Sequence, residues 1–177
     1  MALRIEAFGR QHRALVTGFQ NQHASLVDYL KRFALRHAEK DLLSRTYLAI
    51  DDTGVADRLA GYFSLSAVSV ERASVARLPE LDRLPRFPIP GVLLARLAVD
   101  GRVQGHGLGR YLFEEALGLT LGLVQAGPIA FRLFATDAID ADAARFYERF
   151  GLARLGDAFP CRMILDLRSI LTGSRRG

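Results

Sequence analysis

The stretch Val92–Gly109 reads VLLARLAVDGRVQGHGLG and decides the fold of this chain. Its first eight residues are an apolar run that predicts a strand, and apolar residues from Leu108 to Val124 recur at helical spacing. Between them lie Gly105, Gly107 and Gly109, which let a backbone approach a ligand closely and turn its N–H groups toward it. The positive end of the helix dipole follows directly, so the loop favours an anion, above all a phosphate.

The spacing of this loop excludes two common phosphate loops. A Rossmann loop reads G-x-G-x-x-G, and a Walker loop needs a Gly-Lys pair, which the sequence does not contain. The pattern Q/R-x-x-G-x-G/A does fit, filled by Gln104, Gly107 and Gly109. That pattern is the pyrophosphate-binding signature of the GNAT N-acetyltransferases, which the chain resembles here. A ligand-free glycine turn between strand and helix is the alternative for these six residues taken alone.

Two flanking segments extend the resemblance. Leu94–Asp100 resembles the GNAT strand that lies beside the pantetheine arm of the cofactor, and Phe146–Leu152 resembles the F-Y-x-x-x-G-F segment of the family. The resemblance spans roughly Arg4 to Leu167. It implies an α/β (α+β) GNAT fold, with a mixed, strongly twisted central sheet and helices on both faces, and acetyl-CoA as the acetyl donor.

Hydrophobic periodicity predicts the remaining elements of one domain over residues 1–177. Asp140 is expected to N-cap the last helix and Gly151 to end it in the left-handed conformation. Residues 171–177 are expected to form a disordered tail. The predicted strands cover 45–50, 59–70, 92–99, 129–135 and 159–167, and the predicted helices cover 26–37, 108–124 and 141–150.

Composition narrows the function classes. The net charge of +5 comes almost wholly from arginine, since Lys31 and Lys40 are the only lysines. A sequence pI near 9.9 points to a polyanionic partner such as nucleic acid, with a solvated basic surface as the alternative. Cys161 is the only cysteine, so no internal disulfide can form, and its apolar surroundings favour a buried structural thiol.

No apolar run is long enough to span a membrane, and the N-terminus carries charge where a signal peptide would be apolar. We therefore expect a cytoplasmic protein, and the sequence suggests no metal site.

The GNAT resemblance assigns a cofactor site. Backbone N–H and C=O groups at Leu97 and Val99, on the strand that also holds Ala98, are implied to bind the pantetheine arm. His106 is expected to be a solvent-facing loop residue, with a phosphate contact as the lesser alternative. Asp140 is also grouped with the cofactor-binding residues. The pyrophosphate is implied to lie against Gln104, Gly105, His106, Gly107, Leu108, Gly109 and Arg110.

Tyr147 is implied to be the catalytic acid. A phenol with a pKa near 10 can donate a proton to the departing CoA thiolate. Without the resemblance, Tyr147 would be interpreted as a core residue, because it shares a helical face with Ala143, Phe146 and Phe150. No acidic residue stands in a recognisable general-base motif, and four acidic residues are interpreted as surface residues: Glu71, Glu80, Asp100 and Glu114. This favours an α-amino acceptor, whose pKa of about 7.7–8 leaves much of it neutral.

Three further segments resemble the GNAT toxins of bacterial toxin–antitoxin pairs. They are Gly61–Ser66, Val70–Arg72 and the proline-rich Leu84–Pro90. The resemblance implies acetylation of the α-amine of aminoacyl-tRNA, inhibition by a ribbon-helix-helix antitoxin, and a possible homodimer. Asn21 and Gln22 depart from the small turn of the group, which bears on substrate recognition. Two alternatives are an acetyltransferase for a small-molecule amine or a protein N-terminus, and a non-catalytic acyl-CoA-binding module.

Arginines outside the cofactor site are candidates for contacts with tRNA phosphates. Arg83, Arg86 and Arg96 are the first choices, because they lie in or just after residues 78–91, which hold four prolines. Arg32 and Arg36 are second choices, four residues apart on the first predicted helix. The alternative for each is a solvated or paired charge, and for Arg96 a buried ion pair.

Overall fold

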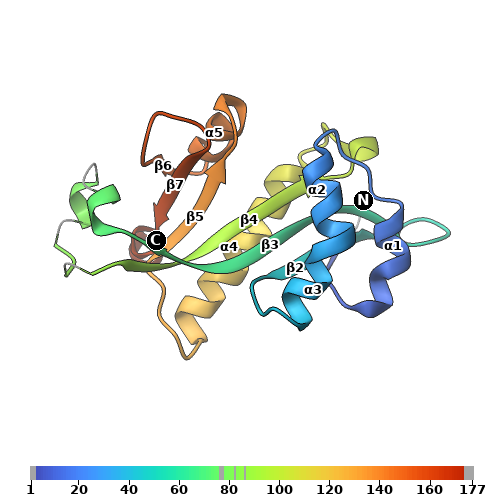
Figure 1. Ribbon diagram of the computed structural model, residues 1–177, viewed down its shortest axis with the longest axis horizontal. Coiled ribbons are helices and arrows are strands. Elements are labelled where there is room, and N and C mark those ends of the chain that lie inside the picture. The colour runs from blue at the N-terminus through green and yellow to red at the C-terminus, as the bar shows by residue number, and fades with distance from the viewer. Residues whose placement is uncertain (1–2, 76–77, 82, 86, 174–177) are drawn as a thin grey trace. The chain divides into compact units, whose positions relative to one another are not determined.

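The computed structural model describes residues 3–75, 78–81, 83–85 and 87–173 (Figure 1). Its strands pair in the order β1-β2-β3-β4-β5-β7-β6. β4 and β5 are parallel, whereas β1 and β2, β2 and β3, β5 and β7, and β6 and β7 are antiparallel, so the sheet is mixed as predicted. The strands are β1 (Leu3–Ala7), β2 (Arg45–Asp51), β3 (Arg58–Val70), β4 (Ile89–Val99), β5 (Leu133–Ala138), β6 (Ala153–Arg154) and β7 (Cys161–Asp166).

Helices connect these strands. The first predicted helix consists of three consecutive pieces, α2 (Ala24–Asp28), the π-helical turn η2 (Tyr29–Phe33) and α3 (Ala34–Glu39). The other α-helices are α1 (Arg13–Thr17), α4 (Leu108–Ala126), α5 (Ala141–Glu148) and α6 (Leu167–Gly173). Short 3-10 turns are η1 (Arg10–His12), η3 (Arg72–Val75), η4 (Pro79–Leu81) and η5 (Gly101–Val103).

The chain divides into two compact units. The first unit comprises Met1–Ser66 and Ala95–Gly118, and the second comprises Ala67–Leu94 and Leu119–Gly177. β3, β4 and α4 each contribute residues to both. The expected single domain stays a prediction.

The first unit has its own hydrophobic core. Leu48 and Tyr62 of the sheet pack with Phe19, Leu30 and Ala34 from the helical side, and all five are essentially inaccessible to solvent. Burial of a side chain the size of Leu or Phe stabilises the fold by about 1.5–3 kcal/mol. Helices α1 to α3 lie along one face of β2 and β3 (Figure 1). This packing holds the polar faces of these helices in fixed positions on the surface.

The second unit is built around Val70, Ile89, Leu133 and Ile164. α5 covers β5 and β7, because its apolar positions fall on one face. The Oδ1 atom of Asp140 accepts a hydrogen bond from the backbone N–H of Ala143 at 2.8 Å. Gly151 follows the helix with φ 84°. Both predicted boundary signals are therefore confirmed.

Some predicted boundaries were wrong. The strand placed at residues 129–135 begins at Leu133, because its partner is β4, where Gly91 pairs with Leu133 and Leu94 with Thr136. The last strand ends at Asp166 and leads into α6, so residues 171–173 are helical and not part of a tail. Residues 174–177 lie outside the described residues. β1 was not predicted at all, yet it forms the edge of the sheet beside β2.

Candidate functional site

The glycine loop directly precedes the long helix α4. Gly105 and Gly107 have φ values of 85° and 78°, in the left-handed region that favours glycine, and α4 begins at Leu108. No other atom lies within 4 Å of where a Cβ would stand at either glycine, so backbone conformation alone demands glycine there. His106, Gly107, Leu108, Tyr111 and Leu3 line an open hollow of about 500 Å³. The loop thus has the conformation and the helix N-terminus that an anion site requires.

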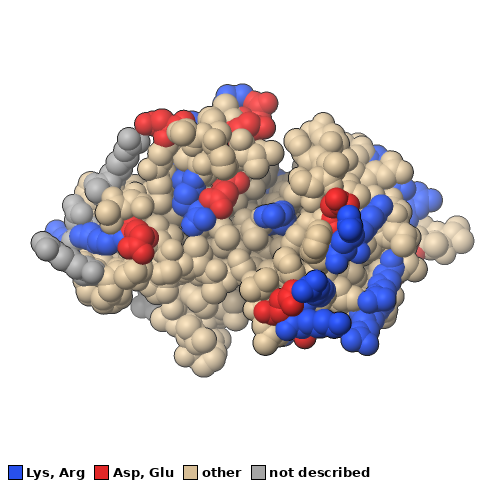
Figure 2. Space-filling model, viewed as in Figure 1, with Lys and Arg blue, Asp and Glu red and all other residues tan. Residues whose placement is uncertain are grey.

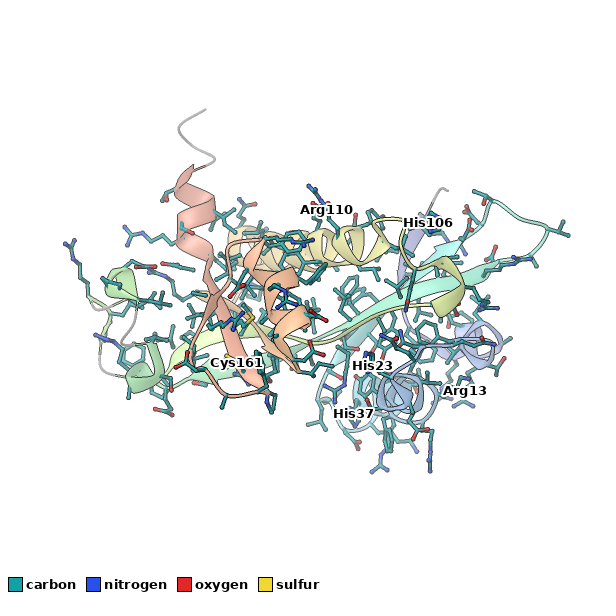
Figure 3. All side chains as sticks on the ribbon, turned by 90° about the horizontal axis from the view of Figure 1, so that it is seen from above. Arg13, His23, His37, His106, Arg110 and Cys161 are labelled. Atoms are coloured by element: carbon teal, nitrogen blue, oxygen red, sulfur yellow. The ribbon has the colours of Figure 1, made fainter. Side chains whose placement is uncertain are left out.

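The two charged or titratable residues predicted on this loop are exposed. His106 is exposed, as expected, and its Nδ1 lies 3.4 Å from the carbonyl oxygen of Val103. Arg110 lies in the first turn of α4 and donates from Nε to Glu114 at 2.7 Å (Figure 3). Glu114 is therefore a helical ion-pair partner one turn away. The roles of Gln104 to Arg110 toward a cofactor stay predictions.

One carbonyl of the predicted cofactor strand accepts hydrogen bonds from side chains. The carbonyl oxygen of Val99 accepts a hydrogen bond from Nδ2 of Asn21 at 2.8 Å and a longer one from Nε2 of Gln104 at 3.3 Å. The role of the Val99 backbone toward the pantetheine arm stays a prediction. Asn21 also accepts from the backbone N–H of His23 at 2.9 Å, which fixes its amide. Leu97 and Ala98, like Val99, stay predicted cofactor contacts.

Asp100 was interpreted as a surface residue, and that interpretation was wrong. Its side chain is buried, and it accepts hydrogen bonds from Nε and Nη2 of Arg102 at 2.7 and 2.8 Å. The backbone N–H groups of Arg102 and Gln20 each donate to it at 3.0 Å. Burial alone would raise the pKa of Asp100, but these hydrogen bonds outweigh it and hold the pKa below its ordinary value. Asp100 is therefore a structural carboxylate that ties the end of β4 to residues 18–21.

Tyr147 and Asp140 belong to the second unit. Tyr147 is 9% exposed, and its ring meets that of Phe146 edge-on at 5.1 Å. Burial raises the pKa of the Tyr147 phenol, and the hydroxyl of Thr136 acts in the opposite direction. Thr136 donates to the carbonyl oxygen of Leu94 at 3.0 Å. The carboxylate of Asp140 is engaged in the helix cap, and its assignment to the cofactor stays a prediction.

A basic groove of about 670 Å³ lies in the first unit. Figure 2 shows Lys and Arg side chains gathered over α1 and α3, and Arg13 is labelled in Figure 3. The charged residues of the lining are Arg10, Arg13, Lys31, Arg32, Arg36, Lys40 and, as the one acid, Glu39.

Several of these cations are free to bind a ligand. Arg10 pairs with Glu39 at 3.0 Å and Arg36 with Asp41 at 2.9 Å. Within the part of the chain that the structure describes, Arg13, Lys31 and Lys40 form no ion pair. The excess of positive charge in the groove is therefore uncompensated and suits a polyanion.

The arginines that were predicted to contact tRNA phosphates lie in different parts of the structure. Arg96 is exposed, and its guanidinium lies 5.1 Å from the ring centroid of Tyr29, so the alternative of a buried ion pair was wrong. Arg83 is exposed in the second unit, and Arg86 lies outside the described residues. The second choices, Arg32 and Arg36, are the ones that line the groove. The sequence did not single out four of the lining cations as phosphate contacts: Arg10 of η1, Arg13 of α1, Lys31 of η2, and Lys40, which directly follows α3.

Two general features also bear on function. Among the described residues, no helix is both long and apolar enough to cross a membrane. In the same residues, no group of three or more His, Cys, Asp or Glu side chains is arranged to hold a metal ion.

Comparison with known proteins agrees with this geometry. The chain is 34% identical, over 136 residues, to the tRNA-acetylating toxin of Mycobacterium tuberculosis, covering 76% of each protein. A tyrosine-to-phenylalanine mutant of KacT superposes with a TM-score of 0.86 at 26% identity, covering 97% of this chain and 99% of that one. AtaT complexed with acetyl-methionyl-tRNAfMet gives a TM-score of 0.83 at 23% identity, covering 97% and 98%. No protein-family model matches the sequence.

The mixed sheet and the left-handed glycine loop before α4 define a GNAT-type N-acetyltransferase. Within that class, the chain belongs to the family of the tRNA-acetylating toxins.

Proposed function

We propose that this protein transfers the acetyl group of acetyl-CoA to the α-amino group of an aminoacyl-tRNA and thereby blocks translation. One observation carries the proposal for this chain: the first unit holds both a left-handed glycine loop before α4 and a groove lined by uncompensated cations. The loop suits the pyrophosphate of acetyl-CoA, and the groove suits the phosphates of an RNA.

Acetyl-CoA supplies the acetyl group as a thioester. The neutral α-amine attacks the thioester carbonyl, so a C–N bond forms, the C–S bond breaks and the amine loses a proton to water. Tyr147 gives its phenolic proton to the departing thiolate and regains one from solvent. Burial raises the pKa of Tyr147, so the phenol remains protonated at neutral pH and can act as this acid. Asp100 is poorly suited to act as the general base, because its carboxylate is buried, both of its oxygens already accept hydrogen bonds, and its lowered pKa makes it a weaker base.

In this proposal the basic groove binds the acceptor stem of the tRNA. Arg13, Lys31 and Lys40 have no competing carboxylate among the described residues, so each can neutralise a phosphate without breaking an ion pair. Each neutralised phosphate releases counterions, which makes the binding strongly salt-dependent.

A direct assay tests this function. The protein is incubated with labelled acetyl-CoA and a pool of aminoacyl-tRNAs, and label in the RNA fraction is measured before and after mild alkaline deacylation. We expect label on the tRNA that leaves as an acetyl-amino acid. Label confined to small amines or to protein N-termini would favour the other acetyltransferase function, and no turnover at all would favour a binding module.

The finer partner assignments are part of the same proposal. AtaT has been solved bound to the C-terminus of its antitoxin AtaR, and KacTA in complex with DNA. By analogy, a ribbon-helix-helix antitoxin encoded beside this protein would bind and inhibit it in the cytoplasm, and the protein would act as a homodimer. Co-expression with the neighbouring gene product, followed by light scattering of the purified protein alone and in complex, tests both assignments.

A further inference from the structure

A π-helical turn interrupts the helical segment of the first unit. In η2 the backbone N–H of Ala34 donates to the carbonyl oxygen of Tyr29, five residues back. Such turns insert an extra residue into a helix and are frequent at functional sites. Tyr29, Phe33 and His37 follow one another at intervals of four, so the rings lie on one side of this segment.

The three rings form a continuous row that ends in an arginine at each side. The ring centroids of Tyr29 and His37 are 5.6 Å apart, and those of Phe33 and His37 are 6.1 Å apart. The guanidinium of Arg96 lies 5.1 Å from the centroid of Tyr29, and that of Arg32 lies 5.8 Å from the centroid of Phe33. We call Arg32, Phe33, His37, Tyr29 and Arg96 the stacking row.

One end of the row is rigid and the other is open. Tyr29 is buried, stacks on Tyr62 at 6.3 Å, and its hydroxyl lies 2.8 Å from Oγ of Ser44. Phe33, by contrast, is 41% exposed, although burial of its ring would be favourable. Arg96 and Arg32 are exposed as well. The row therefore presents one exposed aromatic ring, that of Phe33, beside the guanidinium of Arg32, and the buried contacts of Tyr29 hold the other end of the row in place.

Aromatic rings and guanidinium groups of this kind are suited to bind unpaired nucleotides. Bases that are not paired expose both faces and stack on aromatic rings and on guanidinium planes, whereas a duplex offers mainly phosphates and 2′-hydroxyls. An aminoacyl-tRNA ends in a short unpaired 3′ segment that carries the amino acid. We propose that the stacking row binds the unpaired 3′-terminal bases of the acceptor RNA. This inference rests on the proposed function, which supplies aminoacyl-tRNA as the acceptor.

Charge favours RNA over an apolar protein segment as the occupant. Arg32 belongs both to the stacking row and to the lining of the basic groove, so a chain that follows the groove with its phosphates reaches Phe33 directly. An apolar peptide would gain nothing from the arginines at the two ends of the row.

The test measures binding of two RNA probes without any amino acid. One is a stem-loop with a four-nucleotide unpaired 3′ end, and the other is the same stem-loop with a blunt end. The variant is Phe33→Leu, which keeps an apolar side chain but removes the aromatic face. Its matched control is Phe159→Leu in the second unit, because Phe159 is 40% exposed and has Arg154 5.7 Å from its ring centroid.

We expect Phe33→Leu to weaken binding of the overhang probe about tenfold and to leave the blunt probe unchanged, since one base–aromatic stack is lost. Phe159→Leu should bind both probes like wild type. Arg96→Lys, which keeps the charge but not the planar stack, should also weaken only the overhang probe.

If wild type and Phe33→Leu bind the overhang probe equally well, the proposal that the stacking row binds unpaired bases is wrong. An equal loss for both probes would also overturn it, because the defect would then lie in stem binding. A different result would contradict the proposed function itself, namely that wild type transfers no acetyl group to any aminoacyl-tRNA. Thermal unfolding of Phe33→Leu within the error of wild type confirms that the fold is intact.

Discussion

Tyr147 shows how the surroundings of one residue decide its chemistry. Its phenol is buried, and burial raises its pKa, so it stays in the acid form well above neutral pH. We expect Tyr147→Phe to lower kcat by about 10²–10⁴-fold, a typical contribution of general acid catalysis, and to leave KM for acetyl-CoA nearly unchanged. Tyr47→Phe, on β2, is the control and should have wild-type kinetics. Full activity of Tyr147→Phe would remove this residue from the mechanism.

The pH dependence of the same step follows from the direction of that shift. A raised pKa leaves Tyr147 protonated between pH 7 and 9, so the acid does not limit kcat in this range. The acceptor α-amine, with a pKa of about 7.7–8, becomes neutral across it. We therefore expect the rate to rise from pH 7 and reach a plateau above about pH 8. A fall in rate between pH 8 and 9 would contradict the assignment of Tyr147 as the acid.

Asp100 carries a prediction about stability. Because its folded pKa lies below the unfolded value of about 3.9, it stabilises the fold fully above that value, and the contribution is lost as pH falls through the folded pKa. Asp100→Asn breaks the paired hydrogen bonds with Arg102 and should lower the free energy of unfolding by about 1–3 kcal/mol at pH 7. The difference from wild type should shrink below about pH 4. Urea titrations check this, with the exposed Asp142→Asn as the control.

At the scale of elements, the loop before α4 and the segment of α5 could be predicted because each is marked by local signals. Gly105 and Gly107 are needed for their positive φ values, and Asp140 and Gly151 mark the ends of α5. The groove could not be predicted, because its lining residues are spread over residues 8–40 and come together only when η1, α1, η2 and α3 pack against one another. β1 was missed although Leu3–Ala7 alternates between apolar and charged residues, because five residues give only a weak signal and the strand depends on its pairing with β2.

A substitution in the glycine loop before α4 tests whether this loop binds acetyl-CoA. Gly107→Asp places an L-residue at a φ of 78° and a carboxylate at the start of α4, where the helix dipole and the backbone would receive a phosphate. We expect calorimetry to show no measurable binding of acetyl-CoA. Gly118→Asp is a matched control, because Gly118 lies in the middle of α4 with no atom within 4 Å of its Cβ position and an ordinary φ. Near-normal affinity in Gly107→Asp would show that the cofactor binds elsewhere.

For the molecule as a whole, RNA binding depends more on where the charges lie than on the net charge. The net charge is only +5, yet six cations and one acid line the groove, and three of these cations form no ion pair among the described residues. Arg13→Ala and Lys31→Ala should each raise KM for aminoacyl-tRNA and reduce the slope of log K against log salt by about one, with KM for acetyl-CoA unchanged. Arg145→Ala, a cation paired with Asp142 in the second unit, is the control. Salt-independent acetylation would refute RNA binding through the groove.

The groove has one more consequence, which concerns reactive amines. The only lysines in the sequence, Lys31 and Lys40, both line it, and the other basic side chains are arginines, which acylating reagents do not modify readily. A limiting amount of an amine-reactive ester should therefore label the groove and the chain's own terminal amine, and bound RNA should shield the groove alone. The same placement limits self-modification. While the acceptor RNA is bound in the groove, it covers both lysines, so the enzyme cannot acetylate its own side-chain amines.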